Sequence, residues 1–474
     1  MNQSYQKIFL LLTVLFVWGC TNDLEIAPTD LIDSGVAYEN VADLESGLAA
    51  VYALFPKSPT LRTSTYQTAL CKMASKGRNI GSSAYNWQYT PDTPSLMSDY
   101  GWSGYYSVIN ALNLLLIAAD QVPLPTDADV ALANQIKGEA YGLRALAHFE
   151  LFRIFSESYT QEGASAMPYM LAPQVGEPPR NTVAEVYNFL KEDLQQSAAF
   201  QQQGSREDNE LEYIYFNENA VKALEARIAL YEKDYPTAIQ KATEVLNVKD
   251  IIPQGNYADM FDFDAPDNAE VLFKFDIPAE SGRIGNLWRD NSGLVNFFPT
   301  QDFINAFASN SLGDPELDVR FEVQVAEDAD QIEQTQIVGK YIGGNSAVNA
   351  GDLIVFRSSE MLLIRAEAYY FNNQQSNALQ DIDRLRSERI SGFTNGGENG
   401  LSILNAIKQQ RLLEMSFEGH QWFDLRRWGD PVIRVDVTTV NTPKVLVSSD
   451  HRFVMPIPQH EMLANDNMRQ NSGY

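Results

Sequence analysis

The chain of 474 residues is poor in the residues that build disulfide frameworks and metal centres. It contains two cysteines, Cys20 and Cys71, and four histidines that lie far apart. Two cysteines exclude a disulfide framework, so stability must come from packing, and we expect Cys71 to be buried in the core. There is no Cys/His cluster and therefore no zinc signature, so we predict neither a metal nor a cofactor.

Sequence motifs of common catalytic sites are also missing. No Gly-x-Ser-x-Gly elbow, phosphate-binding loop, His-Glu-x-x-His pair or dinucleotide fingerprint occurs. Glu418 and Asp424 form the one carboxylate pair considered for glycoside hydrolysis, but an active site must be argued from a geometry that the sequence does not show. We therefore expect a protein that is not an enzyme.

Basic residues are scarce relative to acidic ones. Thirty-five Lys and Arg stand against 62 Asp and Glu, a formal net charge of −27. Nucleic-acid binding needs a basic footprint and is excluded, and docking on anionic lipid is disfavoured. So acidic a surface suits a neutral ligand better than an anionic one. The overall charge does not exclude a local basic pocket.

The N-terminus reads as a lipoprotein signal. Residues 1–7 carry one Lys and no acid, residues 8–18 are almost entirely apolar, and Cys20 follows a glycine. The apolar run is too short to span a bilayer, so we predict that residues 1–19 are a signal peptide cleaved before a lipidated Cys20. An ordinary secretory signal is the alternative. Residues 20–33 are polar and acidic, which predicts a flexible tether.

Apolar residues recur at helical spacing through most of the remaining chain. The predicted long helices span Ala131–Phe155, Thr182–Ala199, Asn217–Tyr231, Tyr235–Val248, Ser358–Asn372 and Ser376–Arg389. The second opens with a threonine cap and a glutamate three residues later, which is a capping box. Strand-like runs are few and short, so the pattern favours a mostly α-helical protein.

The last four predicted helices form two pairs that share one pattern. Ala226 and Ala238 stand twelve residues apart in the first pair, as do Ala366 and Ala378 in the second. Small residues at this spacing let paired helices approach closely, as in tetratricopeptide units, which stack to bury a shared face. We predict a tetratricopeptide-like helix-pair scaffold with loop-rich insertions.

Two insertions interrupt this scaffold. Residues 60–106 are rich in Gly, Ser, Tyr and Trp, and residues 250–331 mix Phe, Asp, Asn, Pro and Gly with strand-like runs such as Val271–Phe275. Loops of this length in a compact protein are functional or disordered, and the aromatic content argues against disorder. We predict one globular domain over residues 34–474, with halves 34–215 and 216–474.

The first insertion holds aromatic residues suited to sugar binding. Tyr85, Trp87 and Tyr89 alternate, so an extended backbone would place their rings on one face. Rigid rings offer contact area for the C–H faces of a sugar, while Asn86 and Asp92 would bind hydroxyls. The alternative is that the rings form core beneath the helix that follows.

The second insertion supplies another candidate tryptophan. Trp288 lies between polar residues, with Arg289 and Asp290 next to it. Trp288 and Arg289 are candidate ligand contacts; alternatively, Trp288 covers a helix and Arg289 with Asp290 is a solvated pair. Arg78, in the first insertion, is a further candidate for a hydroxyl or carboxylate, or a solvated loop charge.

One C-terminal segment carries most of the sequence information. Arg411–Gly429 reads RLLEMSFEGHQWFDLRRWG and resembles the SusD/RagB family signature R..El.fEG.RwfDLrRwg. Its apolar spacing predicts a helix that Gly419 ends. In this resemblance Glu418 and Asp424 look like helix-end and ion-pair elements with the two adjacent arginines, Arg426 and Arg427.

Two further stretches extend the resemblance. The pattern W...Y..I...N, a family core pattern, occurs at Trp102–Asn113, and Phe453–Tyr474 is similar to the family's l.PIP..Ei..Np.l.QNpGy, with Ser472 in place of proline. The resemblance implies a non-catalytic outer-membrane lipoprotein, displayed on the cell surface, with helix pairs as scaffold and the ligand site in the insertions. It implies that the protein binds a glycan and passes it to a SusC-like TonB-dependent transporter as a hinged lid.

Three other readings remain open at this point. The RagB branch of the family binds peptides, and peptides also stack on tryptophan and tyrosine. A surface glycoside hydrolase would need a carboxylate pair that the sequence does not identify. A lid without a ligand site of its own would bind nothing in isolation.

Overall fold

The computed structural model describes residues 38–93, 100–174, 176–206, 211–280, 282–310, 313–344 and 346–474. The predicted signal peptide, the predicted lipidation site Cys20 and the predicted tether lie outside these ranges. In the part of the chain that is described, no helix is both long and apolar enough to cross a membrane.

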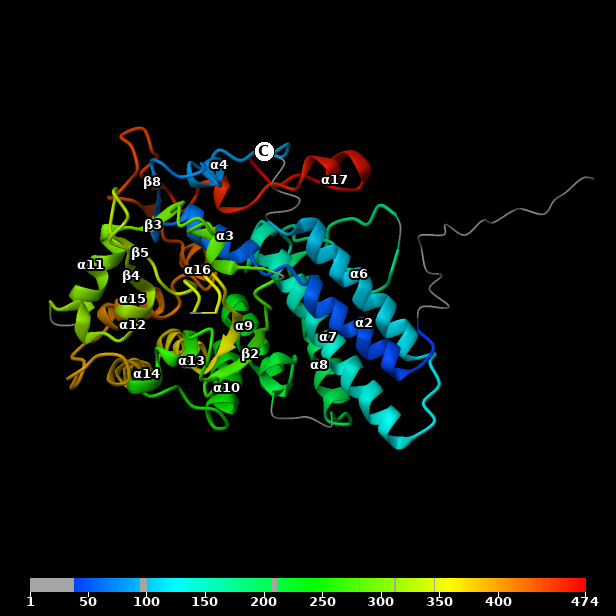
Figure 1. Ribbon diagram of the computed structural model, residues 1–474. Helices are drawn as coiled ribbons and strands as arrows, with labels where there is room; N and C mark the ends of the chain where they lie inside the picture. The colour runs from blue at the N-terminus through cyan, green and yellow to red at the C-terminus, as the bar shows by residue number, and fades with distance from the viewer. Residues whose placement is uncertain are drawn as a thin grey trace, which may run out of the picture.

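Helices dominate, and four of them lie together on one side of the molecule (Figure 1). These are α2 (Val41–Leu54), α6 (Trp102–Ala119), α7 (Asp127–Phe155) and α8 (Val183–Gln201). The predicted capping box is confirmed, because the Thr182 side chain accepts from the Glu185 N–H while the Glu185 carboxylate accepts from the Thr182 N–H. Trp102 is 2% exposed and packs edge-on against Phe155, which confirms its expected core role.

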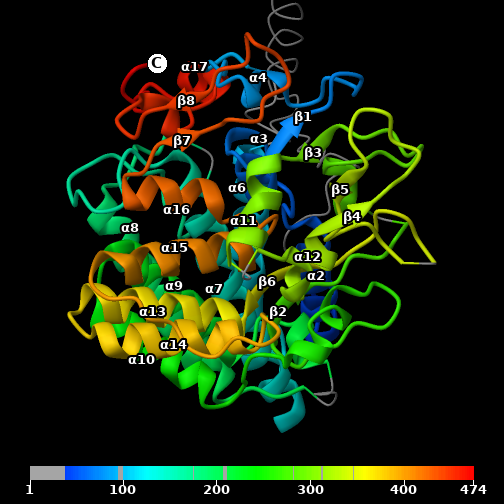
Figure 2. The same cartoon turned by 90° about the vertical axis from the view of Figure 1, so that its left-hand side faces the viewer.

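The predicted helix pairs are confirmed. One pair is α9 (Glu218–Glu232) with α10 (Tyr235–Leu246), the other is α13 (Ser358–Phe371) with α14 (Gln375–Ser387), and α13 packs on α10. All four alanines of the predicted repeat are fully buried. Figure 2 shows these pairs stacked beside α15 (Leu401–Glu414) and α16 (Gln421–Trp428). The fold is mostly α-helical with a tetratricopeptide-like scaffold.

Strands are short and form two-stranded antiparallel sheets among the described residues. The pairs are β1 (Cys71–Met73) with β3 (Phe297–Pro299), β2 (Val271–Phe275) with β6 (Leu353–Arg357), β4 (Val325–Glu327) with β5 (Gln336–Val338), and β7 (Val432–Ile433) with β8 (Val445–Leu446). The predicted strand-like run is β2 itself. The β1–β3 pair sets Cys71 opposite Pro299 and so joins the two predicted insertions.

Short helices fill the connections. They are α3 (Pro59–Gln67), α4 (Ser82–Tyr85), α11 (Gln301–Asn310), α12 (Arg320–Gln324) and α17 (Gln459–Ala464), with 3-10 turns η1 (Glu212–Ile214), η2 (Gln254–Asn256), η3 (Asp259–Phe261), η4 (Ile284–Leu287), η5 (Pro315–Leu317) and η6 (His451–Phe453).

The helix expected to end at Gly419 ends earlier. Helix α15 stops at Glu414, and Phe417 already has a positive φ of 62°, so the chain turns before the glycine. Gly419 (φ 85°) lies inside this turn, where an added Cβ would approach Thr60 Oγ1 to 2.9 Å. The turn, rather than a longer helix, carries Glu418 into the interior.

A balanced cluster of buried charges surrounds this turn. Glu414 accepts from Arg357 at 2.6 Å, from Arg389 at 3.1 Å and from Arg320 at 3.2 Å. Four cations and four anions, each with a side chain no more than 1% exposed, make up the cluster: Arg320, Lys340, Arg357, Arg389, Glu270, Asp318, Glu414 and Glu418. Close opposite charges are what make burial of so many ions tolerable.

The ion pairs expected within the signature are partly wrong. Asp424 does pair with Arg427, at 2.9 Å, and also with Arg411 at 2.7 Å. Arg426 instead donates to the backbone carbonyls of Arg153 and Ser156. Glu418 pairs with Lys340 and Arg357 of the buried charge cluster. These partners lie more than sixty residues away in the sequence, so the residues around Glu418 do not predict them.

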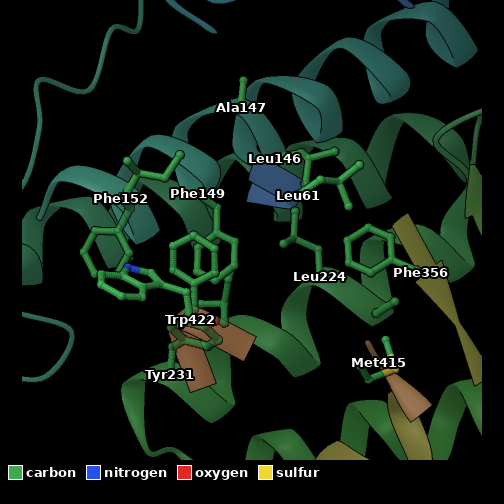
Figure 3. Packing of buried hydrophobic residues seen from close by; sticks show 14 of the residues in the cluster. Leu61, Leu146, Ala147, Phe149, Phe152, Leu224, Tyr231, Phe356, Met415 and Trp422 are labelled. Carbon is green, nitrogen blue, oxygen red and sulfur yellow. The ribbon is translucent and has the colours of Figure 1, made fainter. Parts of the chain in front are cut away.

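Aromatic packing ties α16 to the long helices. Phe149 and Phe152 of α7, Tyr231 of α9 and Trp422 of α16 lie together in the core (Figure 3). The Arg153 guanidinium of α7 lies 4.4 Å from the centroid of the fully buried Phe423 ring of α16. Removing a ring of this size from such a core costs about 3–5 kcal/mol, so the WFDLRRW part of the signature is a structural element.

Replacing Gly142 with alanine should destabilise the protein, although alanine is the better helix former. Gly142 lies within α7, and an added Cβ would stand 2.2 Å from Cδ1 of Phe216, whose ring is fully buried. We expect overpacking to lower the free energy of unfolding by about 1–3 kcal/mol in urea titrations. Gly163→Ala, where no atom lies within 4 Å, is the control and should change it by less than about 0.5 kcal/mol. Equal stability of the two variants would contradict this packing.

Candidate functional site

The three rings predicted to form a sugar-binding face are buried. Tyr85 is 0% exposed, Trp87 2% and Tyr89 3%. The expected extended backbone is wrong, because Tyr85 ends helix α4 and Trp87 adopts a positive φ of 53°. The alternation in sequence therefore does not produce an open aromatic face.

Arg434 explains why these rings turn inward. Its guanidinium lies 4.4 Å from the Tyr85 ring centroid and 4.1 Å from that of Trp87, distances typical of cation–π contacts. It also donates to three backbone carbonyls of the first insertion. The Trp87 Nε1–H donates to the Gln67 carbonyl at 3.0 Å. Both rings thus anchor the first insertion to a residue more than three hundred positions away.

The polar residues predicted beside these rings remain nearer the surface. Asn86 is half-buried and donates from Nδ2 to the Ser82 carbonyl at 2.9 Å. Asp92 is exposed and accepts from the Thr90 hydroxyl at 2.6 Å. Both contacts are local, and neither residue lies beside an open ring.

The second predicted tryptophan is also a core residue. Trp288 is 2% exposed, and its ring stacks on that of Tyr341 with centroids 5.6 Å apart. The predicted ion pair between Arg289 and Asp290 is wrong, because each residue pairs with another partner. Arg289 pairs with Asp328 at 3.3 Å, while Asp290 pairs with Arg78 at 2.6 Å.

The Arg78–Asp290 contact connects the two predicted insertions. Hydrogen bonds from Ser292 and Arg78 lower the pKa of the Asp290 carboxyl to about 2. The Arg78 side chain is 57% exposed, so the pair contributes about 0–1 kcal/mol to stability. With the β1–β3 sheet, it brings the insertions to one edge of the scaffold.

At this edge lies a cleft of about 950 Å³, which we call the α2–β2 cleft. One wall comes from the C-terminal end of α2 and the start of α3, the other from the end of β2 and from η4. Its floor includes Phe55 and Phe275, whose rings stack with centroids 4.6 Å apart. A space of this size accommodates a small ligand or several residues of a polymer.

Hydrogen-bond donors surround the α2–β2 cleft. Four basic side chains line it, Lys57, Arg62, Arg206 and Arg283, against two acidic ones, Glu45 and Asp276. Arg206 pairs with Glu45 at 2.6 Å. Lys57 donates instead to backbone carbonyls at the end of α2, and burial lowers its pKa to about 8. This is a local basic surface on an acidic protein.

The walls of the α2–β2 cleft are aromatic and aliphatic. Tyr52 and Tyr215 are half-buried and meet edge-on, with centroids 6.2 Å apart. Arg206 lies 4.2 Å from the Tyr215 ring centroid. Aliphatic side chains from both walls complete the lining: Leu48, Ile80, Ile214, Ile277, Ile284 and Leu287. Rings next to guanidinium and amide groups provide stacking and hydrogen bonding together.

Sequence reasoning located only part of this cleft. Arg283 and Asn286 lie in the tryptophan-containing loop that the sequence singled out, and Ile80 follows Arg78 closely. Tyr52 and Lys57 were missed, because as isolated residues at a helix end they resemble ordinary surface positions. Among the described residues, no three His, Cys, Asp or Glu side chains converge as in a metal site.

Family models match both ends of the chain. The model described as "SusD family" matches residues 338–474, and the model described as "Starch-binding associating with outer membrane" matches residues 27–230. The two matches flank the second insertion.

Full-length relatives and solved structures agree with these matches. SusD-like protein P2 of Formosa agariphila is 23% identical over all of both chains, and SusD-like protein P38 of the same organism is 22% identical over 98% of each. A SusD superfamily structure from Bacteroides thetaiotaomicron has a TM-score of 0.79 at 21% identity, covering 91% of this chain and 99% of that one. A putative sugar-binding protein from Bacteroides vulgatus has a TM-score of 0.77 at 24% identity, covering 92% and 99%. With the buried signature turn, the helix pairs and these matches in place, the chain belongs to the SusD/RagB family.

Proposed function

We propose that this protein binds a glycan in the α2–β2 cleft and does not transform it. The observation that carries the proposal is a cleft of about 950 Å³ in which rings and charged donors lie side by side. Support comes from the family descriptions, one of which is starch-binding, and from the neighbouring structure described as a putative sugar-binding protein. Glu418 and Asp424 are buried and bound to cations, so they are unavailable for acid–base chemistry.

We further propose a lipid-anchored position on the outer face of the outer membrane. A signal peptide over residues 1–19 and lipid at Cys20 would tether the domain through the acidic residues 20–33. The description "associating with outer membrane" supports this location. From there the protein would pass its glycan to a SusC-like TonB-dependent transporter, acting as a hinged lid.

Removing Arg283 from the cleft should weaken glycan binding by roughly 10- to 150-fold, because a charged donor to a sugar oxygen contributes about 1.5–3 kcal/mol. The measurement is calorimetric titration of the chain from Cys20 onward, purified in detergent. Maltoheptaose, cellohexaose and laminarihexaose are the probes. Arg283 is half-buried, and its guanidinium donates to the Val348 carbonyl at 2.9 Å, so loss of its side chain leaves no unpaired buried charge.

Arg78→Ala is the matched control for this test. It removes an arginine from the same edge of the scaffold, but Arg78 does not line the cleft. We expect its affinity to equal that of the wild type. Equal losses in both variants, or none in either, would show that the cleft is not the site.

A peptide ligand is the second candidate function. The aliphatic residues of both walls favour it, since apolar side chains of a peptide would bury there more readily than a sugar would. Competition decides between the two: displacement of the bound oligosaccharide by short peptides, with binding heat for peptides alone, would move the assignment to the peptide-binding branch.

A further inference from the structure

A second cavity of about 720 Å³ opens elsewhere on the molecule and shares no lining residue with the α2–β2 cleft. Its walls come from the turn between α9 and α10, the C-terminal end of α13, helices α15 and α16, and the last residues of the chain. Scaffold helices, the family signature and loop residues form it, whereas α2 and the two insertions build most of the cleft. We call it the signature cavity.

A pair of stacked rings, one exposed and one half-buried, lies at the signature cavity. Tyr235 and Phe371 stack with centroids 5.3 Å apart and an interplanar angle of 15°. Phe371 is 38% exposed, an unusual position for a phenylalanine on the last turn of a helix. Phe371 is the more exposed ring of the pair, whereas Tyr85 and Trp87, the rings predicted to be open, are at most 2% exposed.

Polar groups around the signature cavity have hydrogen-bonding capacity left over. Asn471 is 2% exposed, and its Nδ2 donates to two backbone carbonyls, but its buried Oδ1 has no partner among the described residues. Arg426 contacts backbone carbonyls and the Tyr159 ring, and no carboxylate of the described residues lies within salt-bridge distance of it. A buried acceptor without a partner costs about 1–3 kcal/mol. A small shift of the chain end would bring Asn471 Oδ1 within reach of a ligand hydroxyl, which would recover this cost.

Donors and acceptors in the signature cavity are mixed in a way that suits hydroxyls. Glu157 accepts from the Ser472 N–H and hydroxyl, both at 3.0 Å, and Ser158, Thr160 and Ser448 add further hydroxyl groups. A sugar hydroxyl both donates and accepts, so it pairs with acids, guanidinium and serine alike. Apolar groups line the cavity as well, among them Leu230, Leu404 and Trp428 beside the Tyr235–Phe371 pair. This mixture of polar and apolar surface matches the hydroxyls and the C–H faces of a sugar ring.

We propose that the signature cavity is a second saccharide-binding site, with a sugar ring on Phe371 and its hydroxyls facing Asn471 and Arg426. The ligand class rests on the proposed glycan-binding function, but the site is separate from the α2–β2 cleft. Two sites on one anchored protein would hold a polysaccharide more tightly than either site alone, because the second contact forms at high effective concentration.

Trp428 provides a direct test. It lines the signature cavity and is half-buried, while Trp87, Trp102, Trp288 and Trp422 are at most 2% exposed. Acrylamide quenching of the chain from Cys20 onward, in detergent, therefore reports mainly on Trp428. We expect maltoheptaose, cellohexaose or laminarihexaose to reduce this quenching severalfold, and the reduction to disappear in Trp428→Phe.

Variants separate this site from the cleft. Phe371→Ala should weaken the protection of Trp428 about three- to tenfold, while Leu401→Ala, an exposed residue on α15 outside the cavity, should leave it unchanged. Arg283→Ala should weaken the calorimetric binding at the cleft yet preserve the protection. No protection by any of the three oligosaccharides, or undiminished protection in a folded Phe371→Ala, would overturn the second site while leaving the cleft assignment intact.

Discussion

Replacing Glu414 with glutamine should lower the free energy of unfolding by about 3–5 kcal/mol, the usual cost of breaking a buried ion pair. Glu414 is fully buried and accepts from Arg320, Arg357 and Arg389, whose charges hold the pKa of its carboxyl well below the ordinary value. Glutamine has the shape of glutamate but no charge. Its amide NH2 group would also place two N–H donors against arginine side chains, which are themselves donors. The loss measured in urea unfolding should therefore be electrostatic.

Glu218→Gln serves as the control for Glu414→Gln. Its carboxylate is 52% exposed and lies 3.7 Å from Lys222 one helical turn away. Solvent screens such a pair, so the change should stay below about 0.5 kcal/mol. If Glu414→Gln proved as mild as this control, the eight-residue charge cluster would not exist as described.

Acidification from pH 6.5 to pH 5 should cost about 2 kcal/mol of stability through His148 alone, since one unmatched proton is worth about 1.4 kcal/mol per pH unit. Burial lowers the pKa of His148 to about 3 in the folded protein. Between the unfolded pKa near 6.5 and pH 3, only the unfolded chain takes up the proton, so stability is present above this window and is lost as the pH falls.

The geometry explains why His148 resists protonation. Its Nδ1 lies 2.9 Å from the Arg144 carbonyl, and Nε2 accepts from the Met170 N–H at 3.0 Å. A proton on Nε2 would break that second bond inside the core. His420, also buried, has its pKa lowered in the same direction by burial and the nearby arginines, so it adds to the acid sensitivity.

The test measures the slope of unfolding free energy against pH. His148→Gln keeps one donor and one acceptor but cannot titrate, so the slope between pH 6.5 and 5 should fall by one proton, about 1.4 kcal/mol per pH unit. Leu401→Ala, at a residue that is 73% exposed and carries no titratable group, should leave the slope as it is. An unchanged slope in His148→Gln would mean that this histidine is protonated in the fold.

Elements set by local spacing were predictable from sequence. The alanine repeat, the capping box at Thr182 and the core role of Trp102 all depend on neighbours within a few residues or on general packing rules, and the structure confirms them. The family signature was recognisable because its residues are tied to one another and to the core. Its glutamates need arginines at fixed places, which limits substitution.

The candidate site was not predictable in the same way. Whether Trp87 faces solvent or core depends on Arg434, a contact between distant segments that no local pattern encodes. The same holds for the α2–β2 cleft, whose two walls come from segments about two hundred residues apart in the sequence. The sequence does not distinguish an exposed aromatic ring from a buried one. The open aromatic face predicted for Tyr85, Trp87 and Tyr89 is therefore wrong, because all three rings are buried.

The buried charge cluster also constrains the order in which the chain becomes a folded protein. Its cations Arg320, Lys340, Arg357 and Arg389 all precede Glu414 and Glu418, which supply half of the negative charge. A chain emerging from its N-terminus holds these cations short of partners until residue 418 has appeared. The interior of the second half therefore gains its full complement of negative charge only after the family signature has been synthesised.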